Sequence, residues 1–319
     1  MKSNIAVVIP AFKVSQFILE VIEKIGDEVK WIYVVDDECP EKSGNLVESK
    51  IVDSRVKVIY HKENKGVGGA VKTGYRVALK QGADIIVKVD GDGQIDPTLI
   101  PSLVEPILMG DADYSKGNRF YDLKGIKAMP TIRIVGNLGL TFMTKLSTGY
   151  WEIFDPTNGF TAISRATVAR LDLDSINDRY FFESDMLFHL GMQKSSVIDV
   201  PMSAKYGNEK SNLSVSGSLF LFLGKHVRNF HTRIFYNYFI RDFTVASLQL
   251  LIGFWTTLFG VIIGLNTWMH SVRTNEPSET GTIVLVAILV ITGIQFLLNF
   301  ISYDMSSAPI RRRRNILKP

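Results

Sequence analysis

The chain has 319 residues, of which 46% are hydrophobic, and a mean hydropathy of +0.13. A positive mean hydropathy together with this apolar content does not describe a single ordinary soluble domain. Residues 225–319 hold 10 of the 36 basic and 4 of the 32 acidic residues, a net charge of +6, which leaves −2 for residues 1–224. The positive charge is therefore expected beside lipid headgroups, and no nucleic-acid partner is expected.

Short β-branched runs alternate with amphipathic stretches over the first 200 residues. The runs predict buried strands of a mostly parallel sheet, at Ile5–Ile9, Trp31–Val35, Val56–Tyr60, Ile85–Val89 and Val197–Val200. Helices are predicted between strands at Val67–Lys80 and Leu99–Met109. This alternation indicates one α/β domain, which we place at residues 1–213.

Acidic pairs follow two of the predicted strands. Asp36 and Asp37 end the second strand, and Asp90 and Asp92 follow the fourth. Ligands bind beyond the carboxyl ends of strands in an open α/β sheet, so these side chains are expected at one binding edge. Carboxylates separated by one glycine suit Mg²⁺ or Mn²⁺, which share their shell with substrate phosphates. An isolated D-x-D triplet is usually a turn, but the preceding strand and the second acidic pair favour the functional interpretation.

Three further segments are ambiguous from local pattern alone. Residues 64–74, NKGVGGAVKTG, form a glycine-rich entry to a helix, which suits either a cradle for a nucleotide diphosphate or close packing of helix on sheet. Residues 155–160, DPTNGF, are typical of a turn. Glu183 and Asp185 lie at the start of a predicted helix, where the helix dipole by itself favours carboxylates.

The C-terminal part is expected to bind a membrane. Residues 214–241 mix apolar and aromatic positions with spaced cations, which suits interfacial amphipathic helices; the alternative is an ordinary packing helix of the first domain. Residues 243–272 and 280–303 contain no Asp, Glu, Lys or Arg. Because a helix of about 20 apolar residues spans a bilayer core, residues 242–319 are expected to form a two-helix transmembrane hairpin with a basic cytoplasmic tail.

The charges beside these two runs predict their orientation. Four cations lie between residues 225 and 241 and four arginines at residues 311–314, whereas the connection 270–281 has only Arg273. By the positive-inside rule, both ends and the α/β domain are expected on the cytoplasmic side of the inner membrane. Gln295 and Asn299 share one face of the second run, where they are expected either to pair spans between subunits or to face the first span.

Taken in order, these motifs resemble the inverting family 2 glycosyltransferases, whose catalytic domain has the GT-A fold, a Rossmann-like α/β domain. The motifs are VVIPAF, VVDD, NKGVGGAVKTG, VDGDGQIDP, GNR at 117–119, DPTNGF and FFESD. With two C-terminal spans after an interfacial segment, the chain is similar to the branch that contains dolichyl-phosphate mannose synthase and the bactoprenol glucosyltransferases. The resemblance implies transfer of a hexose or N-acetylhexosamine from a nucleotide sugar, preferably a UDP-sugar, to undecaprenyl phosphate or another polyprenyl phosphate. The product would serve surface polysaccharide or glycan modification at the cell envelope.

The resemblance also implies roles for individual residues. The nucleotide sugar would be bound by Pro10, Ala11, Phe12, Asp37, Lys72, Asp90, Gly91, Asp92 and Gln94. The Mg²⁺ or Mn²⁺ ion would be held by Asp92, Asp90 and Gln94. The catalytic base would be Asp185, supported by Glu183 and Arg119, and the acceptor phosphate would meet Arg133, Asn137, Lys205 and Lys210. A homo-oligomer, a tetramer by resemblance, is implied as well.

The chain departs from the family pattern after the first strand, where the usual tyrosine, asparagine and glutamate are Phe12, Lys13 and Val14. Phe12 keeps a ring for the base but has no hydroxyl. Other interpretations are an enzyme that extends a lipid-linked saccharide, a processive polysaccharide synthase, a nucleotidyltransferase and a non-catalytic membrane scaffold. The chain lacks the Q-x-x-R-W segment expected of the synthase and the glycine- and arginine-rich entry loop expected of the nucleotidyltransferase.

Overall fold

The computed structural model describes residues 3–121, 131–202 and 215–308, without the side chains of residues 131–135 and 215–220. The chain forms two compact units, one built on Met1–Asn229 and one on Phe230–Ala308. The first unit contains the whole sheet, and the second contains two long apolar helices.

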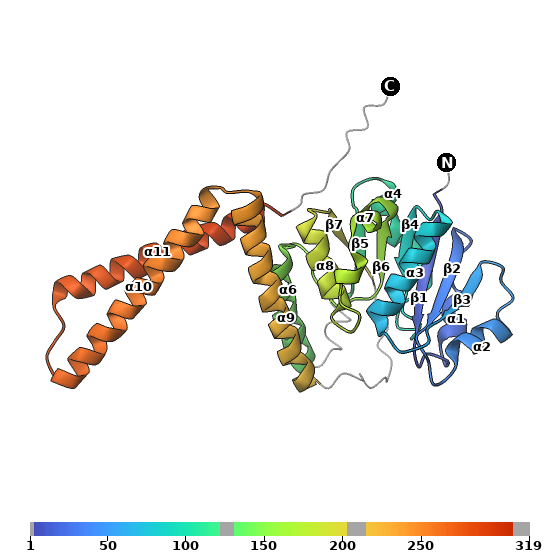
Figure 1. Cartoon of the computed structure of the whole chain (residues 1–319), viewed down its shortest axis with the longest axis horizontal. Coiled ribbons are helices and arrows are strands. Elements are labelled where there is room, and N and C mark those ends of the chain that lie inside the picture. The colour runs from blue at the N-terminus through green and yellow to red at the C-terminus, as the bar shows by residue number, and fades with distance from the viewer. Residues whose placement is uncertain (1–2, 122–130, 203–214, 309–319) are drawn as a thin grey trace, which may run out of the picture. The chain divides into compact units, whose positions relative to one another are not determined.

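A seven-stranded sheet of order β3-β2-β1-β4-β6-β5-β7 forms the centre of the first unit (Figure 1). Its strands are β1 (Ile5–Ala11), β2 (Val29–Asp36), β3 (Val56–Tyr60), β4 (Ile85–Lys88), β5 (Tyr114–Asn118), β6 (Thr161–Ser164) and β7 (Val197–Pro201). All neighbours pair in parallel except β6, which runs antiparallel to both β4 and β5. The five predicted strands are confirmed as β1 to β4 and β7. The strands β5 and β6 were not predicted, because YSKGN and TAIS lack a run of β-branched residues.

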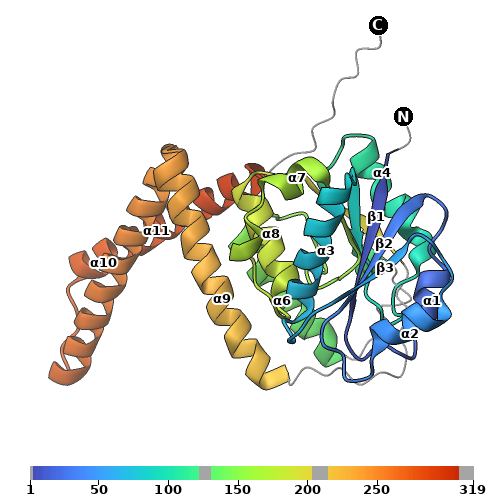
Figure 2. The same ribbon diagram turned by 45° about the vertical axis from the view of Figure 1, so that its right-hand side comes forward.

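Helices cover both faces of the sheet (Figure 2). One face packs against α1 (Ile18–Glu23), α2 (Ser43–Lys50) and α4 (Ile100–Leu108), and the other against α3 (Val67–Gln81), α7 (Arg165–Arg170) and α8 (Phe182–Met192). The two predicted helices are confirmed as α3 and α4. Strand β1 is buried throughout, and alternate residues serve the two cores: Val7 and Ile9 lie in one, Ala6 and Val8 in the other.

The first unit has further helices outside these two layers. Helix α6 (Thr131–Thr148) packs against α8, and α9 (Val215–Phe235) belongs to the first unit as far as Asn229. Short 3₁₀ turns occur at η1 (Pro97–Leu99), η2 (Arg119–Tyr121) and η3 (Leu173–Ser175). On α9, His226 and Asn229 are buried, whereas Leu221, Leu223 and Val227 are exposed. One face of α9 thus packs as an ordinary domain helix, and another presents apolar side chains outward, as an interfacial helix would.

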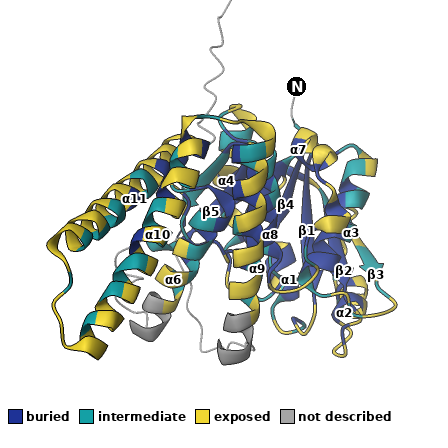
Figure 3. Cartoon of the chain, turned by 60° about the vertical axis from the view of Figure 1, so that its left-hand side comes forward, coloured by how far each residue is buried: buried dark blue, intermediate teal, exposed yellow. Residues whose placement is uncertain are grey.

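In the second unit, α10 (Val245–Thr274) and α11 (Thr280–Ser306) are long and apolar enough to cross a membrane. Their side chains are mostly exposed (Figure 3), which distinguishes them from the core helices of a soluble protein. Glycines allow the two helices to approach closely, since a Cβ on Gly293 would lie 2.3 Å from Oγ1 of Thr257. Gln295 and Asn299 are exposed on α11, so the structure does not support the alternative that they face the first span.

A buried ion pair stabilises the second unit. Arg233, near the end of α9, lies 2.6 Å from Oδ1 of Asp304, and both side chains are almost fully buried. The π-helix η4 (Tyr236–Arg241) adds the hydroxyl of Tyr238, which donates to the same oxygen at 2.6 Å, while its ring meets Phe300 edge to face. The residues that follow α9 are thereby fixed to the end of α11.

We expect Asp304→Asn to lower the free energy of unfolding by about 3–5 kcal/mol, because it removes the carboxylate charge that pairs with the buried Arg233. The double variant Arg233→Met/Asp304→Leu should recover most of this loss, since it removes both charges. Denaturant unfolding in detergent measures both effects. Arg228→Met, at an exposed position of α9, is the control; an Asp304→Asn protein as stable as this control would contradict the assignment.

Candidate functional site

The carboxyl ends of the parallel strands β1, β2 and β4 meet at one edge of the sheet, as predicted. At the end of β2, the carboxylate of Asp36 accepts the backbone N–H groups of Cys39 and Gly44, both at 2.7 Å. The carboxylate of Asp37 accepts the N–H groups of Lys65 at 2.9 Å and Gly66 at 2.7 Å. Both acids are nearly inaccessible. They organise the loops of this edge and do not present free oxygens to a ligand.

The glycine-rich entry to α3 is closely packed against another segment of the same unit. The N–H of Gly69 donates to the carbonyl of Asp178 at 3.1 Å, and a Cβ on Gly68 would lie 2.4 Å from the carbonyl of Asn177. Lys72 donates to the carbonyl of Ile176 at 2.8 Å and pairs with Asp178 at 2.5 Å. Of the two interpretations of this segment, the structure supports close packing, because the backbone of Asn177 and Asp178 already contacts the N-terminus of α3.

At the end of β1, Pro10 and Ala11 are buried, and the ring of Phe12 is 43% exposed. The next residue, Lys13, has a φ of 58° and donates its N–H to Sγ of Cys39 at 3.0 Å. A turn of this kind leaves an accessible aromatic face at the strand edge. Such a face suits stacking against a planar base.

Asp90, Gly91 and Asp92 follow β4, and Gly93 adopts a φ of 75° that favours glycine. Oδ1 of Asp92 accepts the backbone N–H of Gln94 at 3.0 Å, while the Gln94 residue is itself exposed. Asp96 then caps η1 by accepting the N–H of Thr98 at 3.2 Å. The D-x-D segment is thus a defined turn that leads into a capped helix.

The side chain of Lys88, which was not predicted as a site residue, contacts this turn at Asp90. Its Nζ is 2.6 Å from Oδ1 of Asp90 and 3.0 Å from Oε1 of Glu183, and it donates to the carbonyl of Gly159 at 3.3 Å. Burial alone lowers the pKa of Lys88, but the two carboxylates outweigh burial and raise it well above the usual lysine value. Burial raises the pKa of Glu183, and Lys88 opposes that rise. A lysine inside the apolar run IIVKV was the sequence signal available.

The DPTNGF turn reaches the same place. A Cβ on Gly159 would lie 1.8 Å from Oδ2 of Asp90 and 2.5 Å from Nζ of Lys88, so only glycine fits there. At the start of the turn, Asp155 has a φ of 53° and is almost fully buried. Both oxygens of Asp155 bind the guanidinium of Arg119, each at 2.7 Å. Burial by itself raises the pKa of Asp155, but the hydrogen bonds from Arg119 prevail and lower it.

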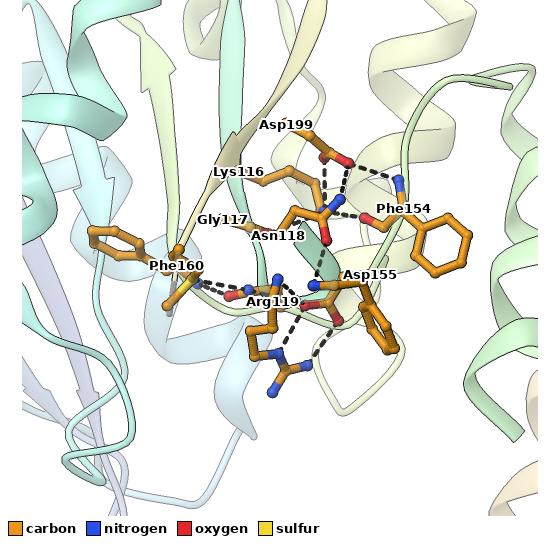
Figure 4. A network of polar contacts seen from close by, with 11 residues as sticks. Lys116, Gly117, Asn118, Arg119, Phe154, Asp155, Phe160 and Asp199 are labelled. Atoms are coloured by element: carbon orange, nitrogen blue, oxygen red, sulfur yellow. Dashed lines mark hydrogen bonds and ion pairs between the residues drawn. The ribbon is translucent and has the colours of Figure 1, made fainter. Parts of the chain in front are cut away.

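A second buried lysine joins the GNR segment to this turn (Figure 4). Lys116 on β5 pairs with Oδ1 of Asp199 on β7 at 3.0 Å and donates to the carbonyl of Phe154. Oδ2 of Asp199 accepts the side-chain amide of Asn118 and the N–H of Phe154, both at 2.7 Å. Arg119 therefore projects from a segment that is fixed on both sides.

Asp185, the predicted base, is held by two hydrogen bonds from within the first unit. Its Oδ2 accepts the N–H of Asn177 at 2.8 Å, and its Oδ1 accepts the side-chain amide of Asn229 at 2.9 Å. One turn before Asn229 on α9, His226 is buried, shares a hydrogen bond of 2.8 Å with Ser147, and has its pKa lowered by burial to about 4. Glu183, and not Asp185, is the helix acid that shares a partner with Asp90.

The predicted contacts to the acceptor phosphate stay predictions. Lys205 and Lys210 lie outside the described residues, and Arg133 lies on α6 among residues whose side chains are not described. Asn137 is half-buried on α6.

Asp90 and Asp92 suit a divalent cation whose remaining ligands come from a bound substrate. In the part of the chain that the structure describes, no group of three or more His, Cys, Asp or Glu residues is arranged to hold a metal ion alone. Asp90 and Asp92 fit instead the pattern in which one or two carboxylates bind Mg²⁺ or Mn²⁺ and substrate phosphates complete the shell.

Comparison with known proteins agrees with this geometry. The family model described as "Glycosyl transferase family 2" matches residues 6–171. The chain is 32% identical over 216 residues to the UDP-N-acetylglucosamine–dolichyl-phosphate N-acetylglucosaminyltransferase of Methanococcus voltae, covering 63% of this chain and 86% of that protein. It is 29% identical over 174 residues to the undecaprenyl-phosphate mannosyltransferase of Micrococcus luteus, covering 54% and 70%.

Among solved structures, the fold is similar to glucosyl-3-phosphoglycerate synthase from Mycobacterium tuberculosis, crystallised with Mn²⁺, uridine diphosphate and phosphoglyceric acid. The TM-score is 0.54 at 20% sequence identity, over 72% of this chain and 78% of that one. The predicted GT-A fold is confirmed.

We expect Arg119→Met to lower the free energy of unfolding at pH 7 by about 2–3 kcal/mol, because it leaves the Asp155 carboxylate buried without its charged donor. With Arg119 present, the depressed pKa of Asp155 stabilises the fold above the unfolded value of about 4, and this stabilisation is lost as the pH falls. Without Arg119, burial raises that pKa, so stability should instead fall as the pH rises above about 4.

Denaturant unfolding between pH 3 and pH 7 distinguishes these two slopes. Arg76→Met is the matched control, because Arg76 forms a 2.6 Å pair with Asp174 at an exposed position. Identical pH profiles of stability for Arg119→Met and Arg76→Met would show that Arg119 does not lower the pKa of Asp155.

Gly159→Ala should destabilise the protein by about 1–3 kcal/mol or more, because its Cβ would displace Asp90 and Lys88. Gly139→Ala is the control, since a Cβ there has no neighbour within 4 Å. Thermal unfolding of the two variants provides the comparison. If Gly159→Ala unfolded at the temperature of Gly139→Ala, the close approach of the turn to Asp90 would be wrong.

Proposed function

The chain belongs to glycosyl transferase family 2, and from this we propose that it transfers a hexose or N-acetylhexosamine, from a UDP-sugar by preference, to a polyprenyl phosphate in a membrane, with inversion at the anomeric carbon. One observation carries the proposal: the same chain has an acid-lined edge of a GT-A sheet and two helices of spanning length. The relatives named for transfer to dolichyl phosphate and undecaprenyl phosphate support a lipid acceptor.

On the donor side, we assign the base to the exposed ring of Phe12 and the diphosphate to the turn at Asp90 and Asp92. A divalent ion held by Asp92, with Asp90 and Gln94 beside it, would supply Lewis-acid stabilisation of the charge that develops on the leaving diphosphate. Pro10 and Ala11 form the buried support of this edge. Asp37 and Lys72 contribute by fixing the loops around it.

On the acceptor side, the phosphate needs little activation. A phosphate monoester has a second pKa of about 6 and is mostly dianionic near pH 7. This suits a site in which Asp185 already accepts two hydrogen bonds from the protein, so we assign Asp185 an orienting role. Arg119, Arg133 and Lys205 are the cations proposed to offset the incoming dianion.

The second candidate is extension of a lipid-linked saccharide. Its acceptor would be a sugar hydroxyl, which requires a general base to remove a proton. The relatives named for transfer to dolichyl phosphate and undecaprenyl phosphate favour the phosphate acceptor over the hydroxyl. A non-catalytic scaffold is disfavoured, because the buried charges around Lys88 and Asp90 would incur a desolvation cost without serving a ligand.

The proposed setting is the inner membrane, with the catalytic domain on the cytoplasmic side, and a role in supplying surface polysaccharide. The two spanning-length helices and the basic segments beside them support the membrane. A homo-oligomer, a tetramer by resemblance, remains part of the proposal.

The test incubates the purified full chain with Mg²⁺, undecaprenyl phosphate and a panel of UDP- and GDP-sugars, and identifies the lipid product by mass. We expect one sugar linked to one polyprenyl phosphate. Asp92→Asn should lower turnover about 100-fold or more, the scale of one lost Lewis-acid contact. The control is Asp111→Asn, because Asp111 lies in the loop before β5, away from the carboxyl ends of the parallel strands.

Two outcomes would count against the proposal. Transfer to a lipid-linked saccharide without transfer to the lipid phosphate would establish the second candidate. Full transferase activity of Asp92→Asn would show that the D-x-D turn does not hold the donor.

A further inference from the structure

The two acids at the start of α8 have different neighbours. Oε1 of Glu183 lies 3.0 Å from Nζ of Lys88, the same ammonium group that contacts Asp90. Because an α-helix turns once in about 3.6 residues, side chains two positions apart point in nearly opposite directions. Glu183 therefore belongs to the surroundings of the D-x-D turn, whereas Asp185 projects from another side of α8.

On that side, Asp185 is held by helix α9. Its Oδ1 accepts the side-chain amide of Asn229 at 2.9 Å, and its Oδ2 accepts the backbone N–H of Asn177 at 2.8 Å. Asp185 and Asn229 are both 8% exposed. One hydrogen bond thus fixes each oxygen and determines the plane of the carboxylate. Each oxygen of a carboxylate can accept more than one hydrogen bond, so this arrangement is compatible with a ligand.

The position of Asn229 is itself fixed by the packing of α9. One turn earlier, the ring of His226 meets Phe181 edge to face, with centroids 4.9 Å apart, and shares a hydrogen bond of 2.8 Å with Ser147 of α6. Phe181 precedes the first turn of α8, and Asp185 lies one turn later. Helix α9 therefore contacts α8 at two successive turns. A rotation of α9 about its axis would break the contact of His226 and that of Asn229 together.

Another face of α9 suits contact with lipid. Leu223 and Val227 are exposed apolar residues, and Arg228 is an exposed cation on the same helix. Apolar and cationic side chains on the outside of a helix are typical of segments that lie against a membrane surface. The acid that we assign to the acceptor is thus fixed by the helix best suited to meet the membrane that contains the acceptor.

We propose that Asn229 is a positioning residue for the transfer reaction: its amide holds the Asp185 carboxylate in the orientation in which Asp185 meets the acceptor. The inference deepens the proposed function and rests on it for the role of Asp185. Without the amide, the carboxylate is free to turn about its terminal side-chain bond, a torsion with broad preferences. The acceptor step then slows, because fewer bound acceptors lie in line with the anomeric carbon. Binding of the sugar nucleotide does not depend on Asn229.

The test measures transfer to undecaprenyl phosphate by the purified full chain in detergent, with the sugar nucleotide that the parent protein uses. Asn229→Leu has a side chain of similar size and no donor. We expect it to lower kcat about 10- to 100-fold, the scale of a misplaced catalytic group. The KM for the sugar nucleotide should stay within about twofold of the parent value, because the donor side is intact.

A double-variant cycle separates positioning from a role in folding alone. If Asn229 acts through Asp185, then Asn229→Leu should change the residual transfer rate of Asp185→Asn by less than about twofold. A role in folding alone would lower the rate by the same factor in both backgrounds. Should Asn229→Leu not fold, Asn229→Asp takes its place, since it keeps the shape of the side chain and its carboxylate cannot donate.

Tyr150→Phe is the matched control, because it removes another buried hydrogen bond of the first unit, from the Tyr150 hydroxyl to the carbonyl of Ser195 at 2.6 Å. It should lower the melting temperature of the protein and leave kcat within about twofold of the parent value.

Three results would overturn the inference: a kcat of Asn229→Leu equal to that of the parent protein, an equal loss in the Asp185→Asn background, or full activity of Asp185→Asn. A parent protein that forms no lipid product would instead refute the proposed function, and with it the step assigned to Asn229. A parent protein that transfers sugar at the same rate as Asn229→Leu would refute the role of Asn229 alone.

Discussion

Both faces of the central sheet are covered by helices, and this constraint determines how charge is arranged near the candidate site. A charged side chain on such a strand cannot reach water, so it needs a partner inside the fold. Lys88 on β4 and Lys116 on β5 are both 1% exposed, and acids from distant segments, Glu183 and Asp199, compensate them. Each buried cation thus pairs with an acid of a remote element, Glu183 of α8 or Asp199 of β7. Charge compensation, as much as apolar packing, assembles the edge where the D-x-D turn lies.

The sequence predicts those features whose signal is local. Apolar runs identified β1 to β4 and β7, and the charge-free stretches identified the two long helices. The strand β5 was missed because Lys116, Gly117 and Asn118 interrupt its pattern, and nothing local shows that Asp199, 83 residues later, offsets the lysine. The glycine-rich start of α3 illustrates the same limit, because a phosphate cradle and a close packing contact both require glycines at these positions. Only the position of Asp178 against Gly69 distinguished them.

At the candidate site, the sequence identified Asp90 and Asp92 but not the residues that hold them. The resemblance assigned the base to Asp185, and the structure surrounds this carboxylate with two donors from the protein itself. On the membrane side, Arg233 was counted among the cations that favour a cytoplasmic location. The structure buries it against Asp304. A count of charges treats exposed and buried arginines alike. Without Arg233, three of the four cations between residues 225 and 241 are left to support the predicted orientation.

The hydrogen bond from Asn229 to Asp185 determines where the catalytic half of the chain can be separated from the rest. A fragment that stops at residue 213 would lack Asn229, and would also leave Ser147 without the ring of His226. Removing those α9 residues would uncover Phe181, whose ring meets His226 edge to face. The first unit extends to Asn229, so we expect a fragment that keeps these contacts to retain the first part of α9. That fragment would also carry the exposed apolar side chains of this helix into solution, and a detergent would be needed to keep it monodisperse.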